Sequence, residues 1–231
     1  MRALIINGDD FGLSPGVNDG IIEAHQRGVL TSTSLMVTAP AAAQAAELAK
    51  SHPELSTGLH FVDDSPNLDD PGYAAEQFDA QLERFRALTG RDPTHVDAHH
   101  HVHARAGRIT TFAKLVLPLG VPLRLGGQVR YIGGFYAHTT PGVSNVRFVS
   151  PEYLLHVVAN EAFEGFNELG CHPALQGDFD SSYRYEREVE LATLTEPGLR
   201  EGLDNLGVQL VSFHALALSD ASGASPPGAS S

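Results

Sequence analysis

The sequence predicts an α/β fold, an irregular and incomplete TIM-like (β/α) barrel with about seven parallel strands. Short apolar runs that end in turn residues alternate with stretches of helical periodicity along most of the 231-residue chain. Polar residues follow several of these runs, at the strand ends where parallel α/β proteins bind ligands. Because no internal repeat or linker divides the chain, we expect one domain over 1–218. A disordered tail rich in Ser, Gly and Pro is expected over 219–231. A doubly wound open sheet is the alternative architecture.

The first half of the chain shows the clearest alternation. Ala3 begins a short buried strand, and Asp9 and Asp10 stand at its carboxyl end. Ser14 and Pro15 suit the N-cap and first position of a helix. The remaining elements expected here are helices over 16–27, 41–51 and 72–88, and strands over 33–38 and 55–61.

The second half of the chain is less regular. The stretch 126–150 is long, rich in Gly and Tyr, and assigned to neither helix nor strand. Such long loops inside a compact domain are often functional. Around it we expect helices over 109–117, 151–166, 185–194 and 199–206, and strands over 121–125, 169–172 and 208–213.

Residues 95–103, HVDAHHHVH, are the most unusual stretch of the chain, because five of these nine residues are histidine. Side chains alternate between the two faces of a strand, so a strand here places one row of donors on one face. That row comprises His95, Asp97, His99, His101 and His103. Buried imidazoles need hydrogen-bond partners, and such a row is rarely used to fill a core. We therefore expect a metal site here, and spacing alone does not separate His99 from His101 as the ligand.

Two other strand ends offer ligands for the same metal. His60 lies near the end of the strand over 55–61. Of Asp9 and Asp10, one carboxylate can bind metal while the other activates a water. A solvated Asp-Asp loop is the alternative for that pair. One Asp and two His suit Zn²⁺ with an open position, and also Mg²⁺, Mn²⁺ or Co²⁺ with more waters. Asp97 is alternatively a carboxylate that orients one of the imidazoles.

Cys171 and His172 end a predicted strand together, but neighbouring residues on a strand face opposite ways. We interpret Cys171 as a core residue and His172 as either a general acid or base or a structural histidine.

Composition narrows the possible partners. A net charge of −13 disfavours nucleic acid and anionic membranes, and a single cysteine excludes a disulfide framework within the chain. No secretory signal or membrane-length apolar run is evident, so a cytoplasmic protein is expected, with a homodimer left open.

Five segments together resemble one known family. They are NGDDFGLSPGVNDGI at 7–21, GLHF at 58–61, THVDAHHHVH at 94–103, ELGCHPA at 168–174 and SYRYEREVELATL at 182–194. In this order they resemble motifs of the YdjC-like carbohydrate deacetylases, the family of chitooligosaccharide deacetylase. The resemblance runs through nearly the whole chain except the tail.

The resemblance implies a TIM-like barrel that binds a divalent metal, Mg²⁺ or Zn²⁺. It implies Asp10, His60 and His99 as metal ligands, Asp9 as general base and His172 as the acid that protonates the leaving amine. The implied substrate is a small N-acetylated sugar or oligosaccharide. The segment between His60 and His95 is shorter than in the chitooligosaccharide enzymes, which leaves substrate size open.

Two other classes of function remain at this point. A metal-dependent phosphoesterase or other amidohydrolase would use the same ligands, with Arg124 and Arg130 as phosphate-binding residues. A non-catalytic metal- or sugar-binding protein is the second class. Aromatic residues of the long loop, Tyr131, Phe135 and Tyr136, either stack on a sugar ring or pack the loop itself.

Overall fold

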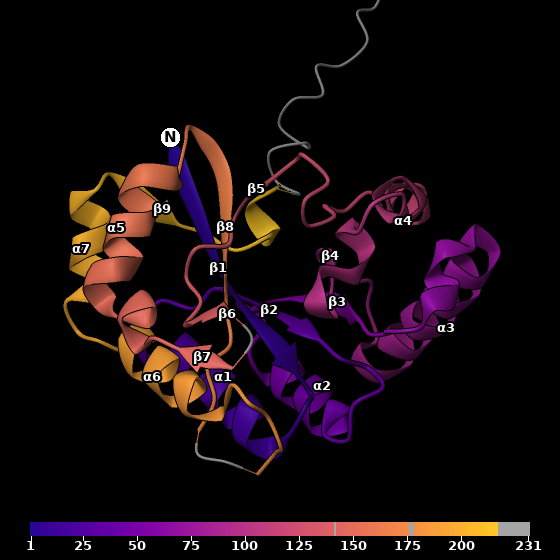
Figure 1. Ribbon diagram of the computed structural model, residues 1–231, viewed down its shortest axis with the longest axis horizontal. Helices are drawn as coiled ribbons and strands as arrows, with labels where there is room; N and C mark the ends of the chain where they lie inside the picture. The colour runs from indigo at the N-terminus through magenta and orange to yellow at the C-terminus, as the bar shows by residue number, and fades with distance from the viewer. Residues whose placement is uncertain (141, 176–177, 217–231) are drawn as a thin grey trace, which may run out of the picture.

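A parallel sheet of seven strands organises the computed structural model, which describes residues 1–140, 142–175 and 178–216 (Figure 1). The strand order is β4-β3-β2-β1-β8-β5, and β9 pairs with the first residues of β1. All of these pairings are parallel. The strands are β1 Arg2–Phe11, β2 Ser32–Leu35, β3 Ser56–Phe61, β4 Val96–Ala98, β5 Arg130–Ile132, β8 Gly165–Cys171 and β9 Val208–Leu210.

The predicted α/β class with a parallel sheet is confirmed, but the expectation of a TIM-like barrel needs correction. The sheet curls into a half-barrel and does not close, because within the described residues its outer strands β4 and β5 do not pair. The chain beyond β4 makes only the single bridge between Val96 and Leu123 where a strand over 121–125 was expected. β5 then pairs with β8 on the other side of the sheet, and no other strand of the described residues joins the two edges.

Seven α-helices among the described residues lie around the sheet (Figure 1). Ser14 caps the first by accepting a hydrogen bond from the Val17 backbone N–H, with Pro15 in the first turn, as expected. The helices are α1 Pro15–Arg27, α2 Ala42–Ser51, α3 Pro71–Thr89, α4 Arg108–Val116, α5 Pro151–Glu161, α6 Arg184–Leu194 and α7 Leu199–Asn205.

The histidine-rich stretch is not the long strand that its alternation predicts. β4 ends at Ala98, where its pairing with β3 also ends, and a 3-10 segment, η2 His99–Ala104, follows. His100 and His101 have left-handed backbone angles, with φ of 52° and 49°. The prediction of a single row of histidines on one strand face is therefore wrong beyond Ala98, because the chain turns there.

The stretch 126–150, which the sequence left unassigned, contains regular structure. Besides β5 it holds an antiparallel pair, β6 His138–Thr140 and β7 Val143–Ser144, and the 3-10 turn η4 Val146–Val149. The predicted helix over 151–166 is too long, because α5 ends at Glu161 and β8 already begins at Gly165. Two further 3-10 turns are η1 Pro66–Asp69 and η3 Leu117–Leu119.

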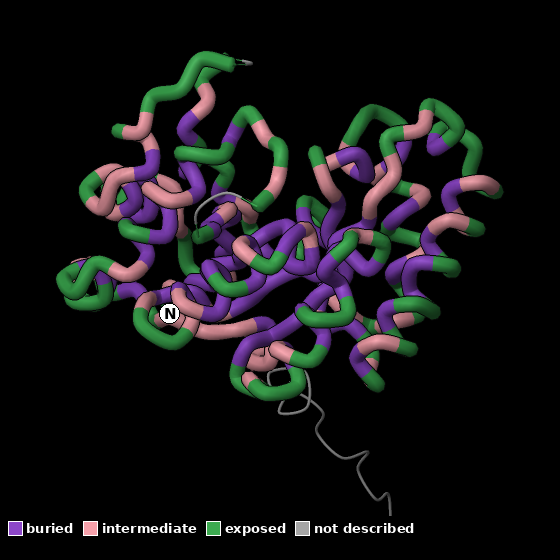
Figure 2. Tube along the Cα trace, turned by 90° about the horizontal axis from the view of Figure 1, so that it is seen from below, coloured by how far each residue is buried: buried purple, intermediate pink, exposed green. Residues whose placement is uncertain are grey.

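Burial follows the sheet. Buried residues gather along the strands in the middle of the molecule, and exposed residues lie on the outer helices and loops (Figure 2). β1 is buried from Ala3 to Phe11, so Asp9 and Asp10 at its carboxyl end are buried as well. Within the described residues, no helix is both long and apolar enough to cross a membrane. The predicted tail over 219–231 lies outside the described residues.

Candidate metal centre and active site

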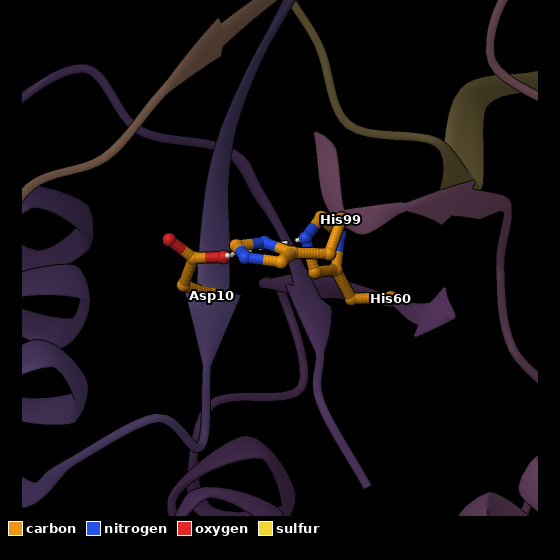
Figure 3. Close-up of side chains that lie close together, drawn as sticks. All are labelled: Asp10, His60 and His99. Carbon is orange, nitrogen blue, oxygen red and sulfur yellow. Dashed lines mark ion pairs between the residues drawn. The ribbon is translucent and has the colours of Figure 1, made fainter. Parts of the chain in front are cut away.

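Three side chains meet at the carboxyl ends of the central strands. Asp10 comes from β1, His60 from β3, and His99 from the turn after β4 (Figure 3). Asp10 Oδ1 lies 3.0 Å from His99 Nδ1 and 3.3 Å from His60 Nε2. One ligand atom from each residue lies within 4.8 Å of those of the other two. Parallel strands present their carboxyl ends at one edge, so residues far apart in sequence converge here.

The backbone at the end of β1 turns so that both aspartates serve the site. Asp10 has a left-handed φ of 68°, which is uncommon for a residue other than glycine and is often found at functional sites. In a regular strand the two neighbours would face opposite sides of the sheet. In this turn Asp9 and Asp10 instead both line the same cavity.

His60 is held in a fixed orientation by Asp97. His60 Nδ1 donates a hydrogen bond of 2.7 Å to Asp97 Oδ1, which leaves Nε2 facing Asp10. Burial opposes a charge on His60, but the carboxylates of Asp97, Asp10 and Asp9 outweigh it and raise the pKa of His60 to about 10. A metal ion binding at Nε2 must therefore displace a proton.

The donor set fits a divalent metal ion. Asp10 Oδ1 and His60 Nε2 are buried and have no hydrogen-bond partner, an arrangement that a shared cation satisfies. One carboxylate oxygen and two imidazole nitrogens are ligands that suit Zn²⁺ and neighbouring divalent ions. His101 is not part of this group, because its Nε2 lies 3.4 Å from the Tyr131 hydroxyl instead.

A second cluster of possible ligands is already neutralised by a guanidinium. Asp9, His60 and Asp97 also bring donor atoms within 4.8 Å of one another. However, Arg124 donates to both oxygens of Asp9, at 2.7 Å each, and lies 2.7 Å from Asp97 Oδ2. The Arg124 side chain is fully buried and also donates to Glu168 at 2.8 Å. The cluster of Asp10, His60 and His99 is therefore the better metal site.

The bidentate contact with Arg124 also sets the charge of Asp9. Burial alone would raise the pKa of Asp9, but the Arg124 guanidinium outweighs burial and lowers it. Asp9 is thus an oriented carboxylate at neutral pH. Because three carboxylates engage its N–H groups, Arg124 has few donors left to bind a phosphate. Arg130 is exposed, and its guanidinium lies 5.4 Å from the centre of the Phe163 ring.

His172 follows β8 and faces the same cavity. Its Nε2 lies 3.9 Å from Asp9 Oδ2, so the two side chains stand side by side at the cavity wall. Burial outweighs the nearby carboxylates and lowers the pKa of His172 to about 4. Cys171 points the other way, is fully buried and donates from Sγ to the Asn7 carbonyl, as expected for a core residue.

The cavity has a volume of about 860 Å³ and is partly open to solvent. Of the loop aromatics, Phe135 is only 2% exposed and belongs to the core, and Tyr131 packs over Arg124 at 4.9 Å. Tyr136 is 40% exposed, and its ring stacks on Tyr183 with 4.5 Å between the centroids. Of these three aromatics, Tyr136 presents the most accessible ring to a ligand.

Sequence reasoning missed two buried charged residues of α6. Arg187 lies 2.5 Å from Asp10 Oδ2 and, against the effect of burial, keeps the pKa of Asp10 well below its usual range. Glu190 contacts the backbone of His172. These residues share the buried face of α6 with Leu191 and Leu194. Charged residues at core positions of a helix are the signal that would have identified them.

Comparison with known proteins identifies the family. The model of the family described as YdjC-like protein matches residues 3–71 and 72–205. The chain belongs to the YdjC-like family. It is 36% identical to a carbohydrate deacetylase of Geobacillus stearothermophilus, over 92% of this chain and 97% of that one. It is 35% identical to a chitooligosaccharide deacetylase of Klebsiella pneumoniae strain 342, over 92% of this chain and 98% of that one.

Solved structures share the fold of this YdjC-like chain. A candidate cellobiose-phosphate cleavage protein from Enterococcus faecalis V583 superimposes with a TM-score of 0.77 at 27% identity, over 93% of this chain and 98% of that one. A family 4 carbohydrate esterase from Streptomyces lividans gives a TM-score of 0.58 at 12% identity, over 90% and 91% of the two chains. At that identity the second likeness concerns the fold alone.

Proposed function

We propose that this protein is a metal-dependent hydrolase that removes acetyl groups from N-acetylated sugars or small oligosaccharides. The observation that carries the proposal is the cluster of Asp10, His60 and His99, which lies in a cavity beside Asp9 and His172. Relatives aligned over 92% of the chain are named carbohydrate deacetylase and chitooligosaccharide deacetylase, which supports the same reaction.

Asp10, His60 and His99 would hold the metal, through one oxygen and two nitrogen atoms. When bound there, a divalent ion polarises the acetyl carbonyl and lowers the pKa of the attacking water. Zn²⁺ suits two imidazoles well, and Mg²⁺, Mn²⁺ and Co²⁺ are the other ions to test. Arg187 holds the second oxygen of Asp10, which leaves the first oxygen for the ion.

Proton transfer falls to Asp9 and His172. Asp9, kept ionised by Arg124, takes a proton from the attacking water. His172 Nε2, 3.9 Å from Asp9 Oδ2, is placed to receive this proton from Asp9 and to pass it to the nitrogen of the departing amine. An amide is a poor leaving group until its nitrogen is protonated, so the acid is as necessary as the nucleophile. The products are acetate and a free amino sugar.

The cavity suits a sugar of limited size. Its volume of about 860 Å³ lies within the usual range for small-molecule sites, about 300–1,000 Å³. The accessible ring of Tyr136, supported from behind by Tyr183, offers an apolar surface for one face of a sugar ring. We expect Tyr136 to affect substrate affinity more than turnover.

Acetate release from N-acetylglucosamine, diacetylchitobiose and longer oligomers tests the proposal. The protein is stripped with EDTA, and Zn²⁺, Mg²⁺, Mn²⁺ or Co²⁺ is restored one at a time. We expect metal-restored acetate release that is absent in His99→Ala. Stoichiometric metal binding without acetate release from any of these sugars would refute the substrate class.

One further variant separates a hydrolase from a binding protein. Asp9→Asn leaves the three proposed metal ligands in place and removes the proposed base. A hydrolase keeps metal binding and loses turnover in this variant. Unchanged turnover would refute the role of Asp9.

A further inference from the structure

Glu190 is a buried carboxylate that the reaction steps above do not use. It lies on α6, fully buried, directly behind His172. A carboxylate is costly to bury unless strong donors hold it, so its position calls for a physical reason.

Both oxygens of Glu190 are bound by residues around His172. The backbone N–H of His172 donates to Oε2 in a short hydrogen bond. The Tyr183 hydroxyl donates to Oε1 at 2.6 Å. That hydroxyl also accepts a hydrogen bond of 2.9 Å from the Ala137 backbone N–H, so its own hydrogen is committed to Glu190.

The His172 ring lies between two carboxylates. On one side Nε2 is 3.9 Å from Asp9 Oδ2, and on the other Nδ1 is 3.9 Å from Glu190 Oε1. Nδ1 is buried and has no hydrogen-bond partner in the structure. A small rotation of the ring brings Nδ1 within hydrogen-bond distance of Glu190, and catalytic hydrogen bonds are often long before substrate binds.

We propose that Glu190 is the positioning residue of His172. As an acceptor for the Nδ1 hydrogen it selects the tautomer that leaves Nε2 free to exchange a proton. The inference rests on the proposed deacetylase function. The proton that Asp9 takes from the attacking water passes to Nε2 of His172, which lies 3.9 Å from Asp9 Oδ2. When the C–N bond breaks, its electron pair stays on nitrogen, and that nitrogen takes this proton from Nε2. The Nδ1 hydrogen remains on His172, and Glu190 itself transfers nothing.

A pair of substrates with different leaving groups tests this role. An N-acetylated sugar needs a proton on its leaving nitrogen, whereas p-nitrophenyl acetate releases a stable phenolate without one. In metal-loaded enzyme we expect Glu190→Gln to lower kcat/KM for the sugar by about 10–100-fold, part of the effect of losing a general acid. Hydrolysis of p-nitrophenyl acetate should change far less. Glu188→Gln, on the same helix but partly exposed, is the matched control and should alter neither.

Two further variants keep the result interpretable. His172→Ala should show the same selective loss, and adding Glu190→Gln to it should cause no further loss. Tyr183→Phe removes only the hydroxyl that binds Glu190 and provides a milder variant if Glu190→Gln folds poorly; a smaller selective loss is expected.

The outcomes separate this inference from the function on which it rests. Equal losses with both substrates in Glu190→Gln and Tyr183→Phe, or no loss in either variant, would overturn the role of Glu190. A selective loss in His172→Ala without one in Glu190→Gln would also overturn it, while leaving the role of His172 intact. Failure of the wild-type enzyme to release acetate from any sugar would instead refute the deacetylase function.

Discussion

Replacing Asp97 by Asn should weaken metal binding although Asp97 is not one of the proposed ligands. Asp97 is fully buried, and its Oδ1 accepts the 2.7 Å hydrogen bond from His60 Nδ1. Its Oδ2 accepts from Ser34 Oγ at 2.8 Å and lies 2.7 Å from Arg124 Nη2. An asparagine has one acceptor oxygen, so its NH₂ group must face either the His60 N–H or the Arg124 guanidinium.

The size of the effect follows from what Asp97 does for His60. Loss of a carboxylate that orients a metal-bound histidine weakens metal affinity by about 10–100-fold. That change corresponds to about 1.4–2.7 kcal/mol of binding free energy. Asp97 and His60 are both buried, so bulk water cannot replace the lost acceptor.

The assay is a competition titration of EDTA-stripped protein against a chromophoric chelator, with Zn²⁺ as the metal. The matched control is Asp64→Asn, whose exposed side chain lies 3.5 Å from His100 and outside the proposed ligand set. Circular dichroism checks that each variant is folded. Equal metal affinities for Asp97→Asn and Asp64→Asn would refute the reasoning.

Three other predictions concern stability. Arg124→Gln leaves three buried carboxylates without the guanidinium that they share. It should lower the free energy of unfolding, measured with urea, by about 3–5 kcal/mol. An unchanged midpoint of the urea unfolding transition would contradict this prediction. Gly58→Ala places a Cβ 2.5 Å from the His95 ring and should cost about 1–3 kcal/mol, whereas Gly198→Ala, with open space around it, should be nearly neutral by thermal melting. Equal melting temperatures for these two variants would show that an added Cβ at position 58 does not clash with the His95 ring. Burial raises the pKa of Glu190 to about 7 from the ordinary value of 4.5. Between these two pH values the folded state keeps a proton on Glu190 that the unfolded state loses. Wild-type stability should therefore fall relative to Glu190→Gln as pH rises from 4.5 to 7, and the difference should then level off at about 3 kcal/mol. A difference that does not change with pH would contradict this assignment.

The residues of the candidate site were predictable where they lie at strand ends. Asp10 and His60 stand at the carboxyl ends of β1 and β3, and His172 directly follows β8. The rule that parallel strands bring these ends together therefore applied without knowledge of tertiary structure. Strand alternation puts His99 and His101 on the same face and does not distinguish them as ligands. Only the family resemblance singled out His99. The turn at His100 and His101, not strand periodicity, places His99 beside Asp10.

The open half-barrel and the buried ionic network could not be predicted from local patterns. A sheet closes into a barrel only if its two edge strands pair with each other. Here β5, which lies between β4 and β8 in the sequence, pairs with β8 and not with β4. In the sequence, Arg124 only keeps the phosphoesterase alternative open. In the structure it binds Asp9, Asp97 and Glu168, which are far from it in sequence. Only the tertiary structure shows which carboxylates surround a buried guanidinium.

Metal titration of the stripped enzyme, followed by acetate release, tests the central claim most directly. Acetate release from the best sugar substrate should rise in proportion to added metal and saturate when the cluster of Asp10, His60 and His99 is filled. His99→Ala should release none at the same metal concentrations. Full activity in metal-free protein, or undiminished activity in His99→Ala, would contradict the claim that this cluster supports a metal-dependent deacetylase.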